Sequence, residues 1–138
     1  VVGAHAALRR PGVDQTPRLL AGVTHPLVHV LAHPRGRVAG RRPGIEARWT
    51  DVFAAAAEHG TAVEVNAYPD RQDLDATLIP EAARAGCLFA VGSDAHAPHH
   101  LAWVDIAVAH LVRAGVPPAR VLNTWDLPAL VGWLRRKR

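Results

Sequence analysis

The sequence contains few of the residues that build disulfide frameworks or membrane spans. Cys87 is its single cysteine, which excludes an internal disulfide framework and is typical of a protein from a reducing compartment. No apolar run approaches the roughly 20 residues that a membrane-spanning helix needs, and the first residues show no signal-peptide pattern. We therefore expect a cytoplasmic protein that does not bind a membrane.

Methionine is absent and lysine occurs once, at position 137. Because the chain opens directly on an apolar, strand-like run with no initiator methionine, we interpret it as a fragment of a longer protein. Its 138 residues, 49% of them hydrophobic, are enough for one domain with a buried core. The formal net charge of +4, with arginines clustered at 9–10, 35–42 and 135–138, favours a phosphate-bearing partner such as nucleic acid. A proteome that prefers arginine to lysine is the alternative explanation.

Strand-like apolar runs lead into histidines at three places in the chain. Residues 1–4 precede His5, residues 28–32 precede His33, and residues 88–91 precede the pair Asp94 and His96. In a parallel barrel the C-terminal ends of the strands meet at one face, where active sites combine residues that are distant in sequence. Imidazole and carboxylate groups together suit Zn, Mn or Fe rather than Ca. The pattern therefore indicates a metal site, although an Asp-x-His triplet also occurs in capped turns.

Segments with helical spacing separate these runs, and a further strand is predicted over 62–65. We expect three apolar helix faces: Trp49, Val52, Phe53 and Ala56; Leu101, Val104, Val108 and Leu111; and Leu127, Leu130, Val131 and Leu134. The predicted fold is α/β, with about four parallel strands alternating with helices. A complete barrel of this type needs about 200 residues, so the chain would form only part of one. The open edge of a partial barrel predicts homodimerisation or poor solubility.

Other polar residues near the strand ends are candidates for supporting roles. Glu64 and Asn66 end the strand at 62–65, and we expect them to hold the metal ligands in place rather than bind metal themselves. Arg35 and Arg37 are candidates for binding a substrate phosphate, since a guanidinium can engage two oxygens at once. Arg71 either contacts the phosphate as well or pairs with a neighbouring carboxylate at position 70 or 73.

Several of these stretches together resemble the polymerase and histidinol phosphatase (PHP) family of metal-dependent phosphoesterases. More narrowly, they are similar to the C-terminal PHP domain of bacterial and archaeal family X DNA polymerases. The stretches are VVGAH at 1–5, LAHPRGR at 31–37 with GRRPG at 40–44, VEVNAYPDRQDLD at 63–75, GSDAH at 92–96 and the terminus VLNTWDLPALVGWLRRKR at 121–138. The resemblance covers essentially the whole chain, and the combination of motifs is far more specific than any one of them.

The resemblance implies a distorted seven-stranded, TIM-like (β/α)7 barrel with up to three divalent metal ions at its C-terminal face. Residues 1–138 would supply strands four to seven and the C-terminal helices, so the N-terminal half of the domain would be absent. His5, His33, Asp94 and His96 match family ligands. The family's remaining ligands belong to the absent half, which would be a partner together with an upstream polymerase core. Ala97 stands where the polymerase relatives usually have serine.

The expected chemistry is hydrolysis of a phosphate ester by a metal-bound hydroxide, with Asp94 and His96 as the catalytic residues. By resemblance to the polymerase group, the substrate would be a DNA 3′ end, processed by a 3′-5′ exonuclease or a 3′-phosphatase in DNA repair. The standalone relatives act instead on small phosphate esters such as histidinol phosphate. A further alternative is a structural or DNA-docking fragment without turnover, because the ligand set is incomplete.

Overall fold

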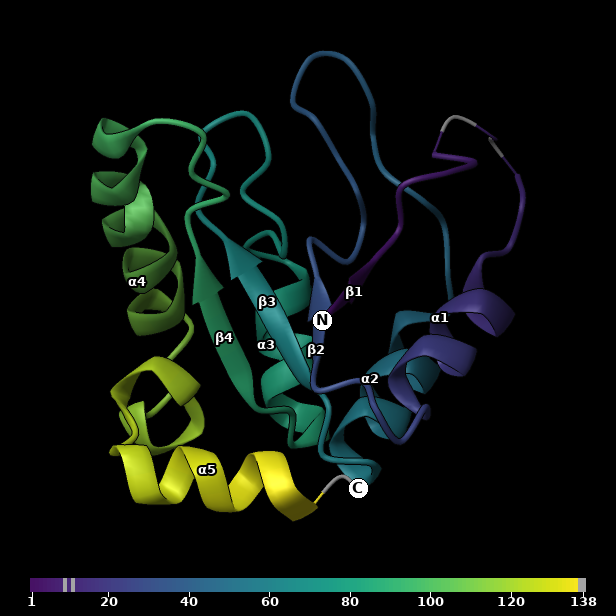
Figure 1. The fold of residues 1–138 in the computed structure, drawn as a ribbon. Coiled ribbons are helices and arrows are strands. Elements are labelled where there is room, and N and C mark those ends of the chain that lie inside the picture. The colour runs from purple at the N-terminus through teal and green to yellow at the C-terminus, as the bar shows by residue number, and fades with distance from the viewer. Residues whose placement is uncertain (9, 11, 137–138) are drawn as a thin grey trace.

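Four parallel strands form one sheet in the computed structural model, which describes residues 1–8, 10 and 12–136 (Figure 1). The strands are β1 (Val2–Gly3), β2 (Val30–Ala32), β3 (Ala62–Asn66) and β4 (Phe89–Gly92), and they lie side by side in chain order. Each strand is parallel to its neighbour because the connection between them crosses back through a helix. All four strand C-termini therefore lie at one end of the sheet. Arg9 of the first arginine cluster and residues 137–138 of the last fall outside the described residues.

Five α-helices pack around the sheet in the described part of the chain. They are α1 (Thr16–Val23), α2 (Trp49–Glu58), α3 (Leu78–Ala85), α4 (Val104–Arg113) and α5 (Leu127–Arg136). Helix α2 packs between α1 and α3, while α4 lies beside β4 (Figure 1). Four parallel strands alternating with helices are what the sequence predicted. The sheet has β1 and β4 as its edges, and none of the described helices is both long and apolar enough to cross a bilayer.

The hydrophobic core includes residues of the apolar helix face that the sequence predicted over 49–56. Val52, Phe53 and Ala56 of α2 are fully buried, as expected for one face of that helix. Leu31 and Phe89 from the strands join them in the same apolar cluster. This buried layer holds the sheet rigidly beneath the loops that follow the strands.

The predicted apolar face over 101–111 is only partly correct, because Leu111 is buried but Leu101 and Val108 are exposed. Residues Pro98–Trp103 form a 3₁₀ helix before α4 begins at Val104. Because a 3₁₀ helix has three residues per turn, it shifts the phase of the α-helical pattern. Leu101, within the 3₁₀ segment, is consequently 64% exposed. Within α4 the buried residues are Ala107 and Leu111, whereas Val108 is 45% exposed.

The face predicted for the last helix is also only partly correct, since Leu130 packs against the apolar cluster that contains Trp133 but two other leucines are exposed. Leu127 is 71% exposed and Leu134 37% exposed, whereas Trp133 is buried. Helix α5 lies across the N-terminal ends of the strands (Figure 1), where Nε1 of Trp133 donates a 3.1 Å hydrogen bond to the carbonyl of Gly60. The helix therefore buries its tryptophan at this contact, while Leu127 and Leu134 stay exposed.

The outer edge of β4 is partly covered by the chain itself. The side-chain amide of Asn123 accepts a hydrogen bond from the Val91 N–H at 2.7 Å and donates one to the Val91 carbonyl at 3.0 Å. Val121 also forms an isolated parallel bridge with Phe89. These contacts satisfy backbone groups that an unprotected edge strand would leave open to another chain.

Candidate metal and phosphate site

The loops that follow the strands gather at one end of the molecule (Figure 1). His5 follows β1 and His33 follows β2, and the centroids of their rings lie 5.0 Å apart with the rings nearly perpendicular. Asp94 and His96 follow β4. The charges of His5 and Asp94 both act on the pKa of His33. The ends of β1 and β4 thus bring His5 and Asp94 near His33.

His33 is the most enclosed of the four predicted ligands. Its side chain is buried, and its Nδ1 has no hydrogen-bond partner in the described part of the chain. Burial lowers the pKa of the imidazole, the charges of Arg71 and His5 lower it further, and Asp94 opposes the shift. A neutral ring with an unpaired buried nitrogen has the properties of a metal donor. Gly3 makes room for the ring, since a Cβ at position 3 would lie 2.7 Å from Cε1 of His33.

Glu64 supports His33 from the end of β3. Its Oε2 accepts hydrogen bonds from the backbone N–H of His33 at 2.5 Å and from Nδ2 of Asn66 at 3.3 Å. Burial raises the pKa of Glu64, the hydrogen bonds from His33 and Asn66 oppose that shift, and the nearby Asp94 charge adds to it. A Cβ on Gly92 would lie 2.2 Å from Oε1 of Glu64, so only glycine leaves room for this carboxylate. Glu64 and Asn66 therefore hold the loop that carries His33.

Asp94 and His96 follow β4 where the backbone is no longer extended. Asp94 has a φ of 52° and leaves the strand conformation. Nδ1 of the exposed His96 lies 2.5 Å from the Asp94 carbonyl oxygen. Because a carbonyl oxygen only accepts, Nδ1 carries the proton and Nε2 keeps a lone pair available for a ligand.

The donor types fit Zn, Mn or Fe, but the described residues contain no group of three or more His, Cys, Asp or Glu side chains arranged to hold a metal ion. The Asp94 carboxylate instead accepts a 2.8 Å hydrogen bond from Nε of Arg71. The unpaired Nδ1 of His33 is the observation that favours a metal here. These residues would therefore supply part of a metal site.

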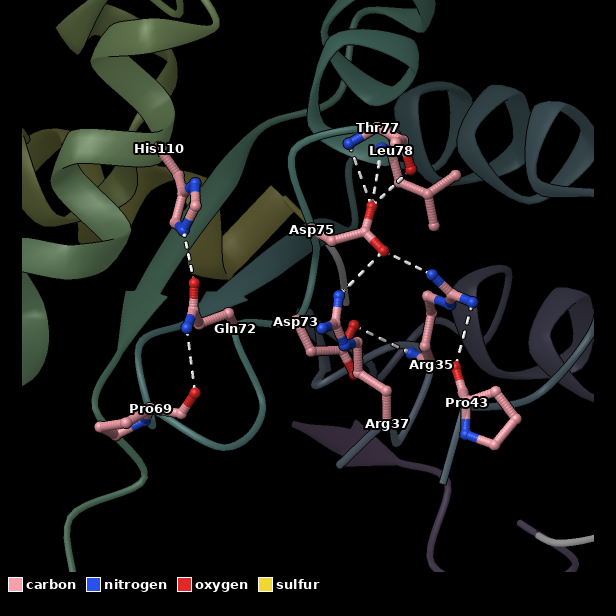
Figure 2. A network of polar contacts seen from close by, with 10 residues as sticks. All are labelled: Arg35, Arg37, Pro43, Pro69, Gln72, Asp73, Asp75, Thr77, Leu78 and His110. Carbon is pink, nitrogen blue, oxygen red and sulfur yellow. Dashed lines mark hydrogen bonds and ion pairs between the residues drawn. The ribbon is translucent and has the colours of Figure 1, made fainter. Parts of the chain in front are cut away.

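All three arginines predicted to bind a substrate phosphate are engaged by carboxylates. Nη1 of Arg35 and Nη1 of Arg37 lie 2.5 and 3.1 Å from Oδ2 of Asp75 (Figure 2), and Arg71 pairs with Asp94. The other carboxyl oxygen of Asp75 accepts hydrogen bonds from the N–H groups of Thr77 and Leu78 at the start of α3. Asp75 thus joins the loop after β2 to helix α3.

A pocket of about 290 Å³ opens beside Asp94. Its lining residues are Val38, Arg41, Tyr68, Asp70, Arg71, Asp94 and His96. Two of them, Arg41 and Tyr68, were not predicted as site residues from the sequence. Arg41 belongs to the arginine-rich loop after β2, and Tyr68 follows β3 just as the predicted ligands follow their strands, so the strand-end argument applied to β3 would have found Tyr68.

The chain is similar to a much longer curated protein. It is 29% identical over 136 residues to the protein of Bacillus subtilis (strain 168) named DNA polymerase/3'-5' exonuclease PolX. The alignment covers 99% of this chain and 24% of that relative, so the chain spans about a quarter of the relative's length. No family model matches the chain.

Proposed function

We propose that this chain is part of a metal-dependent phosphoesterase that acts on DNA ends. The observation that carries the proposal is the placement of His5, His33, Asp94 and His96 after three strands at one end of the sheet, with Nδ1 of His33 buried and unpartnered within the described residues. His5, His33, Asp94 and His96 would hold the divalent ions. When bound, such ions lower the pKa of a water molecule and offset charge on the phosphoryl group.

The chain's own residues prepare this site in three ways. Glu64 accepts a hydrogen bond from the His33 backbone N–H and holds the segment that carries that ring, while the Asp94 carbonyl accepts from Nδ1 of His96. Arg71 neutralises the Asp94 carboxylate. Metal binding at Asp94 would displace the Arg71 guanidinium, which would then be placed to bind a substrate phosphate.

The remaining strands and ligands would come from an upstream half that closes a (β/α)7 PHP barrel. Two observations support this part of the proposal. The sheet has two edges, with β1 at one of them, and the curated relative is about four times as long as the aligned region, which is 24% of it. The upstream half would complete the set of donors that the described residues leave incomplete.

The proposed substrate is a DNA 3′ end, cleaved by a 3′-5′ exonuclease or relieved of a terminal phosphate. The similarity to a protein whose name includes 3'-5' exonuclease supports this choice. The net charge of +4 supports it as well, since a basic chain attracts the phosphates of nucleic acid.

A second candidate is a DNA-docking piece without turnover. The observation that favours it is the 2.8 Å contact between Arg71 and Asp94, together with the lack of a three-donor group within the described residues. In that case the loops would bind DNA but the ions would not be held tightly enough for hydrolysis.

Calorimetric titration with Mn²⁺ and Zn²⁺ tests the proposal. We expect weak binding to the 138-residue chain, tight binding to a version extended upstream, and loss of binding and of phosphodiester hydrolysis in the extended Asp94→Ala variant. Hydrolysis that survives the loss of Asp94 would remove the proposed mechanism. DNA binding without tight metal binding in either version would support the docking role instead.

A further inference from the structure

Arg41 differs from the other arginines at this end of the molecule. Arg35, Arg37 and Arg71 are each paired with a carboxylate, whereas the exposed Arg41 side chain has no hydrogen bond or ion pair within the described part of the chain. Arg41 lines the pocket that also contains Asp94 and His96. Its guanidinium therefore needs no rearrangement before it can bind an anion.

The backbone holds Arg41 close to the loop after β3. Val38 and Arg42 exchange two backbone hydrogen bonds of 2.9 and 2.8 Å, and Gly40 between them has a φ of 68°, so the segment makes a tight turn. The N–H of Ala39 donates a 2.6 Å hydrogen bond to the carbonyl of Asp70. The turn that presents Arg41 is thus joined to the loop that presents Tyr68.

Tyr68 lies at the centre of a cluster of rings beside this pocket. Its ring makes edge contacts with Trp103, His100 and His96, at centroid distances of 4.8, 5.8 and 6.2 Å. His100 stacks on Trp103 at 3.9 Å. Trp103 packs against the core and anchors the cluster, while His96 is exposed and lines the same pocket as Tyr68. Aromatic faces at the surface bind nucleobases by stacking, because every base has a π-face.

We propose that Arg41 and the Tyr68 ring cluster bind the terminal nucleotide of single-stranded DNA, with the phosphate on Arg41 and the base against Tyr68 and His96. Asp70 and Asp94 also line the pocket and repel a phosphate, which places the phosphate on the Arg41 side. The inference rests on the proposed function, since the pocket is the one that contains Asp94. It selects a nucleotide over a small alkyl phosphate, which needs a cation but no stacking surface.

The test measures binding in the absence of hydrolysis. A fluorescein-labelled single-stranded DNA of eight thymidines is titrated with the 138-residue chain in EDTA, and fluorescence anisotropy is recorded. A matched strand has abasic sites at its last two positions. We expect the normal strand to bind about tenfold more tightly than the abasic one, as stacking of one base gives.

Single-residue variants test whether Tyr68 binds the base and Arg41 binds the phosphate. Tyr68→Leu should remove the advantage of the normal strand, and Tyr68→Phe, which keeps the ring, should retain it. Arg41→Gln should weaken both strands by about tenfold, since it removes a phosphate contact. Arg113→Gln is the control for charge, because it alters an exposed arginine at the far end of α4. It should change both affinities much less than Arg41→Gln does.

Equal affinity of the wild-type chain for the normal and abasic strands would overturn the proposal without any variant. Equal effects of Arg41→Gln and Arg113→Gln would overturn the role of Arg41. The outcome is separable from the proposed hydrolysis. Base-dependent binding with no hydrolysis in the metal-loaded extended protein retains the nucleotide site and removes the phosphoesterase. Hydrolysis of bis(p-nitrophenyl) phosphate with no base-dependent DNA binding retains the phosphoesterase and removes the nucleotide site.

Discussion

Arg71 donates a 2.8 Å hydrogen bond from Nε to Oδ2 of Asp94, and both side chains are 25% exposed. Arg71, a candidate for contacting a phosphate, and Asp94, a predicted metal ligand, are thus paired with each other. A guanidinium in this position competes with a divalent ion for the carboxylate and repels the ion as well. In the proposed function, the pair would therefore oppose binding of a metal ion at Asp94.

Replacing Arg71 with Gln should increase the affinity for Mn²⁺ about fivefold, because a partly exposed ion pair contributes about 1 kcal/mol that metal binding must otherwise overcome. Calorimetric titration of the upstream-extended protein measures the change. Arg113→Gln makes the same change in net charge on α4 and should leave the affinity unaltered. Unchanged or weaker binding in Arg71→Gln would show that the pair does not compete with the ion.

The ion pairs of Asp75 predict that the free energy of unfolding falls at acidic pH. Its carboxylate contacts both Arg35 and Arg37 (Figure 2). Burial alone would raise the pKa of Asp75, but hydrogen bonds from Thr77 and Leu78 and the charge of Arg35 outweigh it and lower the pKa below 3.8. A group with a lowered pKa stabilises the fold above its unfolded pKa, and that contribution is lost as the pH falls through the folded pKa.

The variant Asp75→Asn should therefore lower the free energy of unfolding at pH 7 by about 2 kcal/mol, because two guanidinium groups lose a charged acceptor. An amide oxygen can still accept from Thr77 and Leu78, so the start of α3 should persist. Urea unfolding from pH 7 to pH 3 measures the effect. The difference between wild type and variant should shrink below pH 4, and a constant difference across this range would contradict the ion-pair explanation.

Asp73, two residues earlier, should make the free energy of unfolding depend on pH in the opposite direction. Its side chain is fully buried, with Oδ2 unpartnered among the described residues. Burial raises its pKa from 3.8 to about 6, although backbone N–H groups of residues 35–37 oppose the shift. The folded state therefore holds a proton that the unfolded state releases earlier, and stability falls as the pH rises from 4 to 6.

The variant Asp73→Asn should flatten that part of the pH profile. Ionisation of Asp73 should lower the free energy of unfolding by about 3 kcal/mol as the pH rises from 4 to 6, at about 1.4 kcal/mol for each unit of pKa shift. Urea unfolding at half-unit pH steps measures it. The Asp75→Asn protein serves as the matched control, since it should keep this slope. A wild-type profile that is level from pH 4 to 6 would show that Asp73 ionises normally in the folded chain.

The parts of the fold that follow from local spacing could be predicted from the sequence. Val52, Phe53 and Ala56 repeat with a regular helical period and are fully buried. The same spacing failed for Leu101, because the 3₁₀ turn ahead of α4 changes the angle between successive residues. It also failed for Leu127 in the uniform helix α5, where the contact of Trp133 with Gly60 decides which face is buried.

The candidate site was predictable to the level of strand ends and no further. Parallel strands place His5, His33 and Asp94 at one end because connection and direction follow from the alternating pattern. The pairing of Arg35 with Asp75 spans 40 positions, and that of Arg71 with Asp94 spans 23. Such pairs depend on how two loops meet in space, which no local pattern encodes.

Gly3 provides the sharpest test of the space around His33. A Cβ at position 3 would lie 2.7 Å from Cε1 of His33 and 3.3 Å from the Ala32 carbonyl oxygen, so Gly3→Ala should displace the buried imidazole. We expect a loss of about 1–3 kcal/mol in the free energy of unfolding, as for overpacking elsewhere, and weaker Mn²⁺ binding in the upstream-extended protein. Gly132→Ala in α5 is the matched control, because nothing lies within 4 Å of its added Cβ. It should stabilise the helix by about 0.5–1 kcal/mol. If Gly3→Ala binds Mn²⁺ as wild type does, the His33 ring does not donate to the metal.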